Sequence, residues 1–408
     1  MAETGFLGST SITLDHVQEA FREHVDDDKL ILVKVEADTI AAGHGFTSFI
    51  LRLSLTWNDA DKKKHPSLPK SAILKALSKD AIEKLLGMFK LDDGDAKQGF
   101  TQMVISAHKT ECKVYKMFGK ENSPPVPLAR VYATWIGDGV RPPLILLEDL
   151  GDRARVLGDG SASLTHKQLL SAAEVQASLQ AWCLTTDVNW RDKFETFEQR
   201  LPLFAAFVPV MQKAMAKAKE AFPDAFGKLD DAKISRLLQL ETMVQHHDEY
   251  KAWMPSVLNH GDFWANNVMF NKLPDGSMGD DVVALIDWQM PLIGNPLADL
   301  GRMLSMSFDG HLRDAHMDDI IKHYYSCLEK KLGKDMPKEL TLDRVLGMAH
   351  KQAALNCLML FFMQDTMSSL FAPTDSPEDK IKQERMIERA KAALDYASKV
   401  LDITTEEK

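Results

Sequence analysis

The sequence changes character between residues 149 and 160, and this change constrains the fold more than any other feature. Before it stand short runs rich in β-branched and aromatic residues, and after it stand long segments in which apolar residues recur at helical spacing. Strands and helices in separate blocks indicate an α+β fold. We predict a small β-rich lobe of residues 1–148, a hinge or linker of residues 149–160, and a larger, mostly helical lobe of residues 161–408.

The two blocks give approximate bounds for their elements. In the first block the strand-like runs are Leu30–Val35, Phe49–Trp57, Ser71–Lys75, Val131–Trp135 and Leu144–Leu147, with a helix over Phe100–Phe118. In the second block, helices are expected over Thr165–Thr185, Leu201–Phe222, Lys228–His247, Met317–Leu332, Leu342–Phe362 and from Pro377 onward. Two further strand-like runs, Asn267–Phe270 and Val282–Trp288, interrupt these helices and predict a hairpin.

Composition excludes several broad classes of protein. The 408 residues include 49 Lys and Arg against 59 Asp and Glu, a net charge of −10 that disfavours binding to nucleic acid or to an anionic membrane. The four cysteines are widely spaced, which argues against a zinc ribbon and a disulfide framework. The first residues have no signal-peptide pattern, and no apolar run approaches the roughly 20 residues of a membrane span. We expect a reduced, cytoplasmic protein.

The chemistry-bearing residues fall in two stretches, LNHGDFWANN at 258–267 and ALIDWQ at 284–289. They present a carboxylate at Asp262, an amide oxygen five residues later at Asn267, and a second carboxylate at Asp287. Mg²⁺ prefers such hard oxygen ligands, usually together with substrate phosphates. The hairpin could bring Asn267 and Asp287 together and leave Asp262 to accept a proton from an attacking hydroxyl, as in kinases.

The pattern His260-x-Asp262-x₄-Asn267 followed by Ile286-Asp287 resembles the catalytic loop of the aminoglycoside-phosphotransferase and choline-kinase superfamily. The fuller wording, HGDFWANNVMF with IDWQ, is similar to its ecdysteroid-kinase-like (CHK kinase-like) branch. The resemblance implies a bilobed protein-kinase-like fold, with ATP and Mg²⁺ as cofactors and a hydroxyl of a small molecule as acceptor. It further implies that His260 orients the loop, that Asp299 supports it, and that Asn267 rather than Asn266 binds metal.

The first lobe supplies weaker matches in the expected order. Gly43 and Gly45 lie between two strand-like runs, where a glycine loop covers the phosphates of the nucleotide, although two such glycines also suit a simple turn. Lys75 resembles the strand-borne lysine that contacts the α- and β-phosphates, with Lys70 as the competing candidate. Glu111 is the candidate carboxylate partner of this lysine, and otherwise an exposed charge on an amphipathic helix.

The segment after the last strand of this lobe resembles the family's connector. The Glu148 carbonyl and the Leu150 amide are then expected to meet the adenine edge, with Leu147 limiting the depth of the pocket. Gly261 stands where regulated protein kinases place arginine, and no Ala-Pro-Glu motif follows. A peptide substrate is therefore less expected than a small molecule.

The acceptor is the least constrained part of the prediction. The resemblance places ecdysteroid-like or other lipophilic hydroxyl compounds first, and choline or an aminoglycoside second. Four tryptophans could line an apolar cavity, although aromatic residues at helical spacing more often form simple core: Trp182, Trp190, Trp264 and Trp288. A catalytically silent nucleotide-binding protein and a protein kinase of unusual type are the alternatives, and the oligomeric state stays open.

Overall fold

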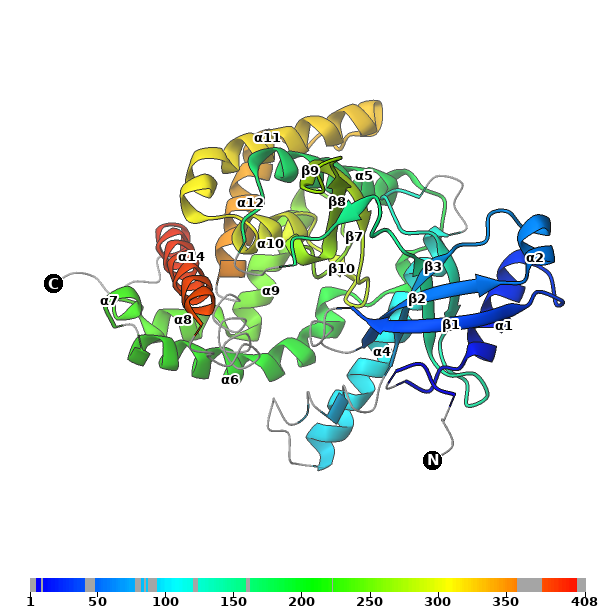
Figure 1. Ribbon diagram of the computed structural model, residues 1–408. Helices are drawn as coiled ribbons and strands as arrows, with labels where there is room; N and C mark the ends of the chain where they lie inside the picture. The colour runs from blue at the N-terminus through cyan, green and yellow to red at the C-terminus, as the bar shows by residue number, and fades with distance from the viewer. Residues whose placement is uncertain are drawn as a thin grey trace. The chain divides into compact units, whose positions relative to one another are not determined.

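The computed structural model describes residues 5–8, 10–40, 48–77, 82–83, 86, 94–119, 124–158, 162–221, 223–357 and 376–401. The chain forms two compact units (Figure 1). The first unit comprises Met1–Pro124 and Leu128–Arg153, and the second comprises Pro125–Pro127 and Ala154–Lys408. The boundary between Arg153 and Ala154 falls inside the segment 149–160.

The first unit is built on one five-stranded antiparallel sheet of order β1-β2-β3-β5-β4. Its strands are β1 (Leu32–Thr39), β2 (Phe49–Trp57), β3 (Ser71–Ala76), β4 (Val131–Trp135) and β5 (Leu144–Glu148). In β2, Leu53, Leu55 and Trp57 are buried while Ser54 and Thr56 are exposed, so one face of the strand joins the core. All five strand predictions are confirmed, with shifts of a few residues at the ends.

In the described part of this unit three helices accompany the sheet, namely α1 (Leu14–Val25), α2 (Asp59–Lys64) and α4 (Gly94–Phe118). The predicted helix over Phe100–Phe118 is confirmed and begins six residues earlier. The sequence analysis did not predict α1, which begins at a Thr13 N-cap with a capping box. Its Phe21 lies in the core, 4.9 Å from the Trp57 ring and 5.0 Å from the Tyr132 ring.

The second unit contains two small antiparallel sheets. In the first, β8 (Val268–Lys272) pairs with β9 (Met278–Leu285) and with β6 (Ala154–Arg155), which confirms the predicted hairpin. In the second, β7 (Val257–Asn259) pairs with β10 (Leu292–Gly294). The prediction that the second hairpin strand continues to Trp288 is wrong, because Asp287 has a φ of 65° and cannot extend a strand.

Most of the other described segments of the second unit are helical. Its longer helices are α5 (His166–Thr185), α6 (Phe197–Ala221), α8 (Asp231–Leu237), α9 (Leu240–Asp248), α10 (Ala298–Met306), α11 (Gly310–Leu332), α12 (Leu342–Cys357) and α14 (Pro377–Leu401). The single segment predicted over Lys228–His247 is two helices, α8 and α9, because the extended backbone of Gln239 separates them. Residues 358–362 of the predicted helix Leu342–Phe362 lie outside the described residues, and α10 was not predicted.

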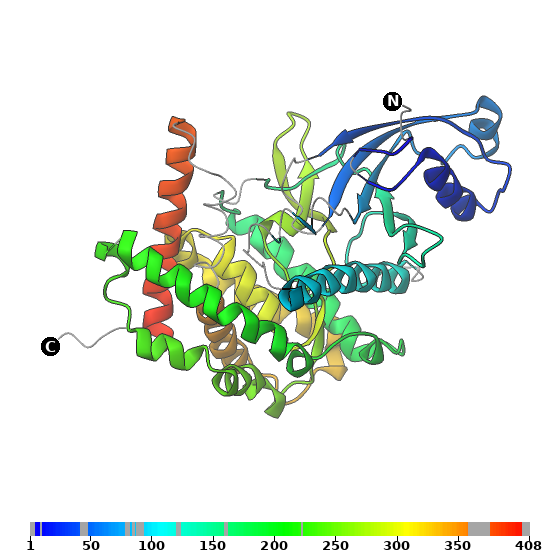
Figure 2. The ribbon, with the colours of Figure 1, turned by 90° about the horizontal axis from the view of Figure 1, so that it is seen from below.

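Helix packing forms the core of the second unit. Helices α12 and α14 lie side by side (Figure 2). Side chains of α6, α8, α12 and α14 share one buried cluster that includes Met211, Ile234, Ala354 and Leu394. Helix α11 lies along α5, and the Tyr324 hydroxyl of α11 donates to Gln180 of α5. The predicted α+β class, with a smaller β-rich part and a larger helical part, is therefore confirmed.

Two further observations concern the whole chain. Throughout the described ranges, every helix falls short of the combination of length and apolarity that crossing a bilayer requires. The four cysteines are free, and burial raises the pKa of Cys112, Cys183 and Cys357 to about 12. These three thiols are therefore unreactive core groups.

Candidate active site

The loop between β7 and β8 has its shape fixed at a glycine. Gly261 has a φ of +78°, and a Cβ at this position would lie only 1.8 Å from the Met290 carbonyl oxygen. That oxygen accepts a 2.9 Å hydrogen bond from Nη1 of Arg200, which is buried and holds it in place. Only glycine fits here, so the absence of arginine from this position has a local steric cause.

Asp299, at the start of α10, holds this loop in place through hydrogen bonds to its backbone. Its Oδ2 accepts a 2.6 Å hydrogen bond from the His260 backbone N–H, and its Oδ1 accepts a 3.0 Å bond from the Gly261 N–H. Gln176 of α5 donates a third bond to it over 3.4 Å. Burial raises the pKa of this carboxyl, and the backbone N–H groups oppose that rise only in part. Asp299 thus joins the loop to two helices.

His260 is completely buried and connects the loop to the hairpin. Its Nε2 lies 3.0 Å from the Ile286 carbonyl oxygen, and its Nδ1 lies 3.3 Å from the Asp262 backbone nitrogen. Because a carbonyl only accepts and an amide N–H only donates, the ring carries its proton on Nε2. The Trp288 ring packs 4.4 Å away and fixes the imidazole plane. His260 therefore sets the spacing between the two sequence stretches.

Asp262 and Asn267 are in direct contact. The Asn267 Nδ2 donates to Asp262 twice, to the backbone oxygen and to the carboxylate Oδ2, each over 2.8 Å. The Asn267 backbone oxygen in turn accepts a 3.0 Å hydrogen bond from the Ile286 N–H. This last bond places Asp287, the next residue, beside the asparagine. Asp262 and Asn267 are thus in contact, and the backbone of Asp287 follows directly on the residue that is hydrogen-bonded to Asn267.

Asp287 occupies a strained backbone position. Its φ of 65° lies in the left-handed region, where few residues other than glycine are found and where Asp and Asn are enriched. Its Oδ2 accepts a 3.1 Å hydrogen bond from Nε2 of Gln289. Backbone strain of this kind is found most often at functional sites, where the surrounding structure maintains it.

Arg302 is a site residue that sequence reasoning missed. Its Nη2 lies 2.5 Å from Oδ1 of Asp262, the carboxylate oxygen that Asn267 does not use. Arg302 stands three residues after Asp299 on α10, so both side chains face the same loop. This i, i+3 spacing was the only signal in the sequence, and it identifies Arg302 only once α10 is known to pack against the loop.

The donor set suits Mg²⁺. The Asn267 side chain uses its amide nitrogen for both hydrogen bonds to Asp262, so its amide oxygen is not engaged by Asp262. Together with the Asp287 carboxylate, this oxygen offers the hard ligands that Mg²⁺ takes in phosphate-binding sites. No soft ligand intervenes in the stretch from Gly261 to Asn267. The residues present therefore fit the ion.

In the first unit, Lys75 and Glu111 form a buried ion pair. The Lys75 Nζ lies 2.6 Å from Oε2 of Glu111, and the two side chains are only 10% and 1% exposed. Lys75 belongs to the central strand β3, while Glu111 belongs to α4. The competing candidate, Lys70, is exposed and precedes the strand. A buried pair of this kind costs desolvation energy on both sides, which makes a purely structural role less favourable.

Of the other candidate nucleotide-binding residues, the structure describes Glu148 and Leu150. Gly43 and Gly45 lie outside the described residues. Glu148 ends β5, where its carboxylate accepts from the Arg130 N–H over 3.1 Å and pairs with Arg153. Leu150 is buried, and its carbonyl accepts a 2.9 Å bond from the Arg153 N–H.

Two of the four tryptophans proposed for an acceptor cavity are core residues. Trp190 and Trp288 are 2% and 0% exposed, so they belong to the packed interior. Trp264 is partly buried against the cluster shared by α6 and α14. The expectation that such residues form core is therefore met for Trp190 and Trp288.

Comparison with known sequences gives a match over nearly the whole chain. The model of the family DUF1679, described as "Uncharacterized oxidoreductase dhs-27", matches residues 2–402. No curated protein sequence shows a significant match to the chain.

Solved structures give matches of similar extent but low identity. Choline kinase from Cryptosporidium parvum Iowa II is 13% identical, with 90% of each chain covered and a TM-score of 0.51. Plasmodium vivax ethanolamine kinase is 12% identical, with 91% of this chain and 83% of that chain covered and a TM-score of 0.40. The GDP complex of aminoglycoside 2'-phosphotransferase-IIIa is 14% identical, with coverages of 92% and 98% and a TM-score of 0.44. The match to choline kinase confirms the predicted kinase-like fold.

Proposed function

The chain belongs to the DUF1679 family, and we propose that it is an ATP-dependent kinase that phosphorylates a hydroxyl group of a small organic molecule. One observation carries the proposal: Asp262, Asn267 and Asp287 are held in one hydrogen-bonded loop-and-hairpin arrangement. A carboxylate base, a metal-binding amide and a metal-binding carboxylate are the parts that kinases use. The fold shared with choline kinase supports the same reaction class.

Each residue then has a defined role. Asp262 orients the acceptor hydroxyl and takes its proton, while Asn267 holds the carboxylate in place. The Asn267 amide oxygen and the Asp287 carboxylate would hold Mg²⁺, which neutralises charge on the β- and γ-phosphates. Lys75, kept in position by Glu111, would neutralise charge on the α- and β-phosphates. Positioning and electrostatics supply most of the rate enhancement in such reactions.

The family description contains the word oxidoreductase, but the described strands do not form the parallel sheet of a dinucleotide-binding fold. Dinucleotide-binding folds are built on a parallel sheet with a glycine-rich turn after the first strand. Every strand ladder in the described parts of both units is antiparallel. We therefore base the proposal on phosphoryl transfer rather than on hydride transfer.

For the acceptor, we infer a lipophilic alcohol of the ecdysteroid or xenobiotic type. What supports this choice is the similarity of HGDFWANNVMF and IDWQ to the ecdysteroid-kinase-like branch. The aromatic residues add little, since Trp190 and Trp288 are buried in the interior. Choline and aminoglycosides are the next acceptors to test.

The decisive experiment is a phosphotransfer screen. The protein is incubated with Mg-ATP and a library of hydroxyl compounds, and mass spectrometry detects products heavier by one phosphoryl group. Asp262→Asn should lower turnover by about 10²–10⁴-fold while Mg-ATP still raises the melting temperature. Asp287→Ala should abolish that rise, because it removes a metal ligand.

Asp281→Asn is a matched control, since Asp281 is an exposed carboxylate on the same hairpin. It should behave like the wild type in both assays. Full activity in Asp287→Ala would refute the metal assignment. Binding of Mg-ATP without transfer to any acceptor or to protein would favour the catalytically silent alternative.

A further inference from the structure

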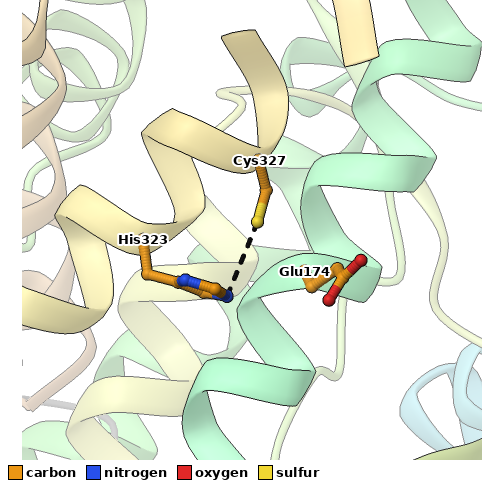
Figure 3. A group of neighbouring side chains, drawn as sticks. All are labelled: Glu174, His323 and Cys327. Carbon is orange, nitrogen blue, oxygen red and sulfur yellow. Dashed lines mark hydrogen bonds between the residues drawn. The ribbon is translucent and has the colours of Figure 1, made fainter. Parts of the chain in front are cut away.

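A cluster of metal-binding side chains lies where α5 and α11 pack together, apart from the residues of the proposed kinase site. His323 and Cys327 are four residues apart on α11, so both side chains lie on the same face of that helix. Glu174 of α5 lies opposite them (Figure 3). One ligand atom from each of the three lies within 4.8 Å of the others. We propose that Glu174, His323 and Cys327 bind a Zn²⁺ ion.

The spacing of the two α11 ligands matches zinc coordination. The His323 Nε2 and the Cys327 Sγ are 3.5 Å apart. With Zn–N of about 2.0–2.1 Å, Zn–S of about 2.3 Å and a tetrahedral angle, the two ligand atoms should be about 3.6 Å apart. The pair therefore needs almost no rearrangement to accept the ion.

The third ligand can reach the same point at little cost. The Glu174 side chain is 56% exposed, and its nearest cation, Lys331, is 3.9 Å away. An exposed ion pair of this length contributes little, so the carboxylate can turn toward the metal. Three protein ligands leave a fourth position for water.

The ligand types select the metal. A thiolate, an imidazole and a carboxylate suit a borderline cation such as Zn²⁺, whereas Mg²⁺ prefers oxygen ligands alone. The site is therefore chemically distinct from the oxygen-lined loop at Asp262. Without metal, the Cys327 thiol has its pKa raised by burial and by the Glu174 charge, and it shares a hydrogen bond with His323.

A metal at this place would clamp the helices that support the loop. Helix α5 contributes Gln176 to Asp299, and Gln180 bonds both to Tyr324 of α11 and to the Pro296 carbonyl. His323 and Tyr324 are consecutive residues of α11, so the ion would bind next to this hydrogen-bond network. Zinc binding should therefore stabilise the second unit without contacting the kinase residues.

The test uses the full chain, stripped of metal by a chelator, and Zn²⁺ alone as the probe. Calorimetric titration should give one tight site, and the melting temperature should rise as the site fills. Cobalt(II) in place of zinc should give a sulfur-to-metal charge-transfer band. Cys327→Ser should remove the band and weaken zinc binding by at least about tenfold to hundredfold.

His323→Gln should weaken zinc binding to a similar degree, whereas His311→Gln, an exposed histidine on the same helix, should leave it unchanged. Circular dichroism establishes that each variant is folded, and the cobalt spectrum of the wild type gives an independent measurement. Equal zinc affinity in Cys327→Ser and the wild type, or a wild-type cobalt spectrum without a sulfur band, would overturn the proposal.

Discussion

Replacing Gly261 by alanine should destabilise the second unit far more than an ordinary glycine substitution. The residue has a φ of +78°, and the left-handed region costs a non-glycine residue about 1–2 kcal/mol. A Cβ here also approaches the Met290 carbonyl oxygen to 1.8 Å, where contacts under 3.0 Å do not occur. That oxygen would have to move by about 1.2 Å, which follows from those two distances.

Moving the Met290 carbonyl oxygen would cost a hydrogen bond. The Met290 oxygen accepts a 2.9 Å hydrogen bond from the buried Arg200 guanidinium. A hydrogen bond to a charged group contributes about 1.5–3 kcal/mol, and a shift of this size breaks it. Together with the backbone cost, Gly261→Ala should lower the free energy of unfolding by about 2.5–5 kcal/mol.

Gly276→Ala provides a matched control. Gly276 has a φ of +83° in the β8–β9 turn, but the nearest atom to its added Cβ is 3.9 Å away. This variant should lose only the backbone cost of about 1–2 kcal/mol. The two variants therefore differ only in the steric clash at the loop.

Urea unfolding followed by tryptophan fluorescence measures the difference. Of the seven tryptophans in the chain, five lie in the second unit, namely Trp182, Trp190, Trp253, Trp264 and Trp288. With an m-value of about 3 kcal/mol per M, Gly261→Ala should unfold at a urea concentration about 0.5–1 M lower than Gly276→Ala. Equal midpoints for the two variants would refute the reasoning that the Met290 carbonyl locks the loop.

Three further predictions follow from individual contacts. Arg302→Gln frees one oxygen of Asp262 and should lower turnover by about tenfold to hundredfold at unchanged affinity for Mg-ATP. Glu111→Gln leaves the buried lysine of β3 without its carboxylate and should lower the free energy of unfolding by about 3–5 kcal/mol. Asp309→Asn should lower the melting temperature at pH 7, and the difference from the wild type should disappear at acid pH, as the pH falls through the lowered pKa of Asp309. Burial would raise the pKa of Asp309, but the hydrogen bond and charge of Arg389 hold it below 3.8, so the stabilisation by the ion pair is complete above pH 3.8 and is lost as the pH falls through that lower pKa.

Controls distinguish these effects from general damage. Arg302→Lys keeps the charge but not the planar guanidinium, so it should restore only part of the turnover. Glu36→Gln removes the carboxylate of an ion pair that is 59% and 62% exposed, and it should change stability by less than about 1 kcal/mol. A melting-temperature difference between Asp309→Asn and the wild type that grows toward acid pH would contradict the stabilising role of the Asp309–Arg389 ion pair.

Much of the fold was predictable because local patterns encode it. Alternation of buried and exposed residues defined β2, and helical spacing defined α5 and α11. Helix α1 was missed although Thr13 and His16 form a capping box, because its apolar stripe is short. The end of the second hairpin strand was predicted three residues too late, because nothing in the pattern Ile-Asp-Trp shows that Asp287 has a positive φ.

The sequence by itself determined the candidate catalytic residues of this protein: Asp262, Asn267 and Asp287 occur at fixed spacing along one loop and one hairpin, and local hydrogen bonds connect that loop to that hairpin. Only the tertiary structure decided which side chains from distant parts of the sequence come into contact. Arg302 reaches Asp262 across 40 residues, and Glu174 faces His323 from another helix. Such contacts depend on how helices pack, and the apolar periodicity that makes a helix pack does not specify which polar residue at its edge will face which neighbour.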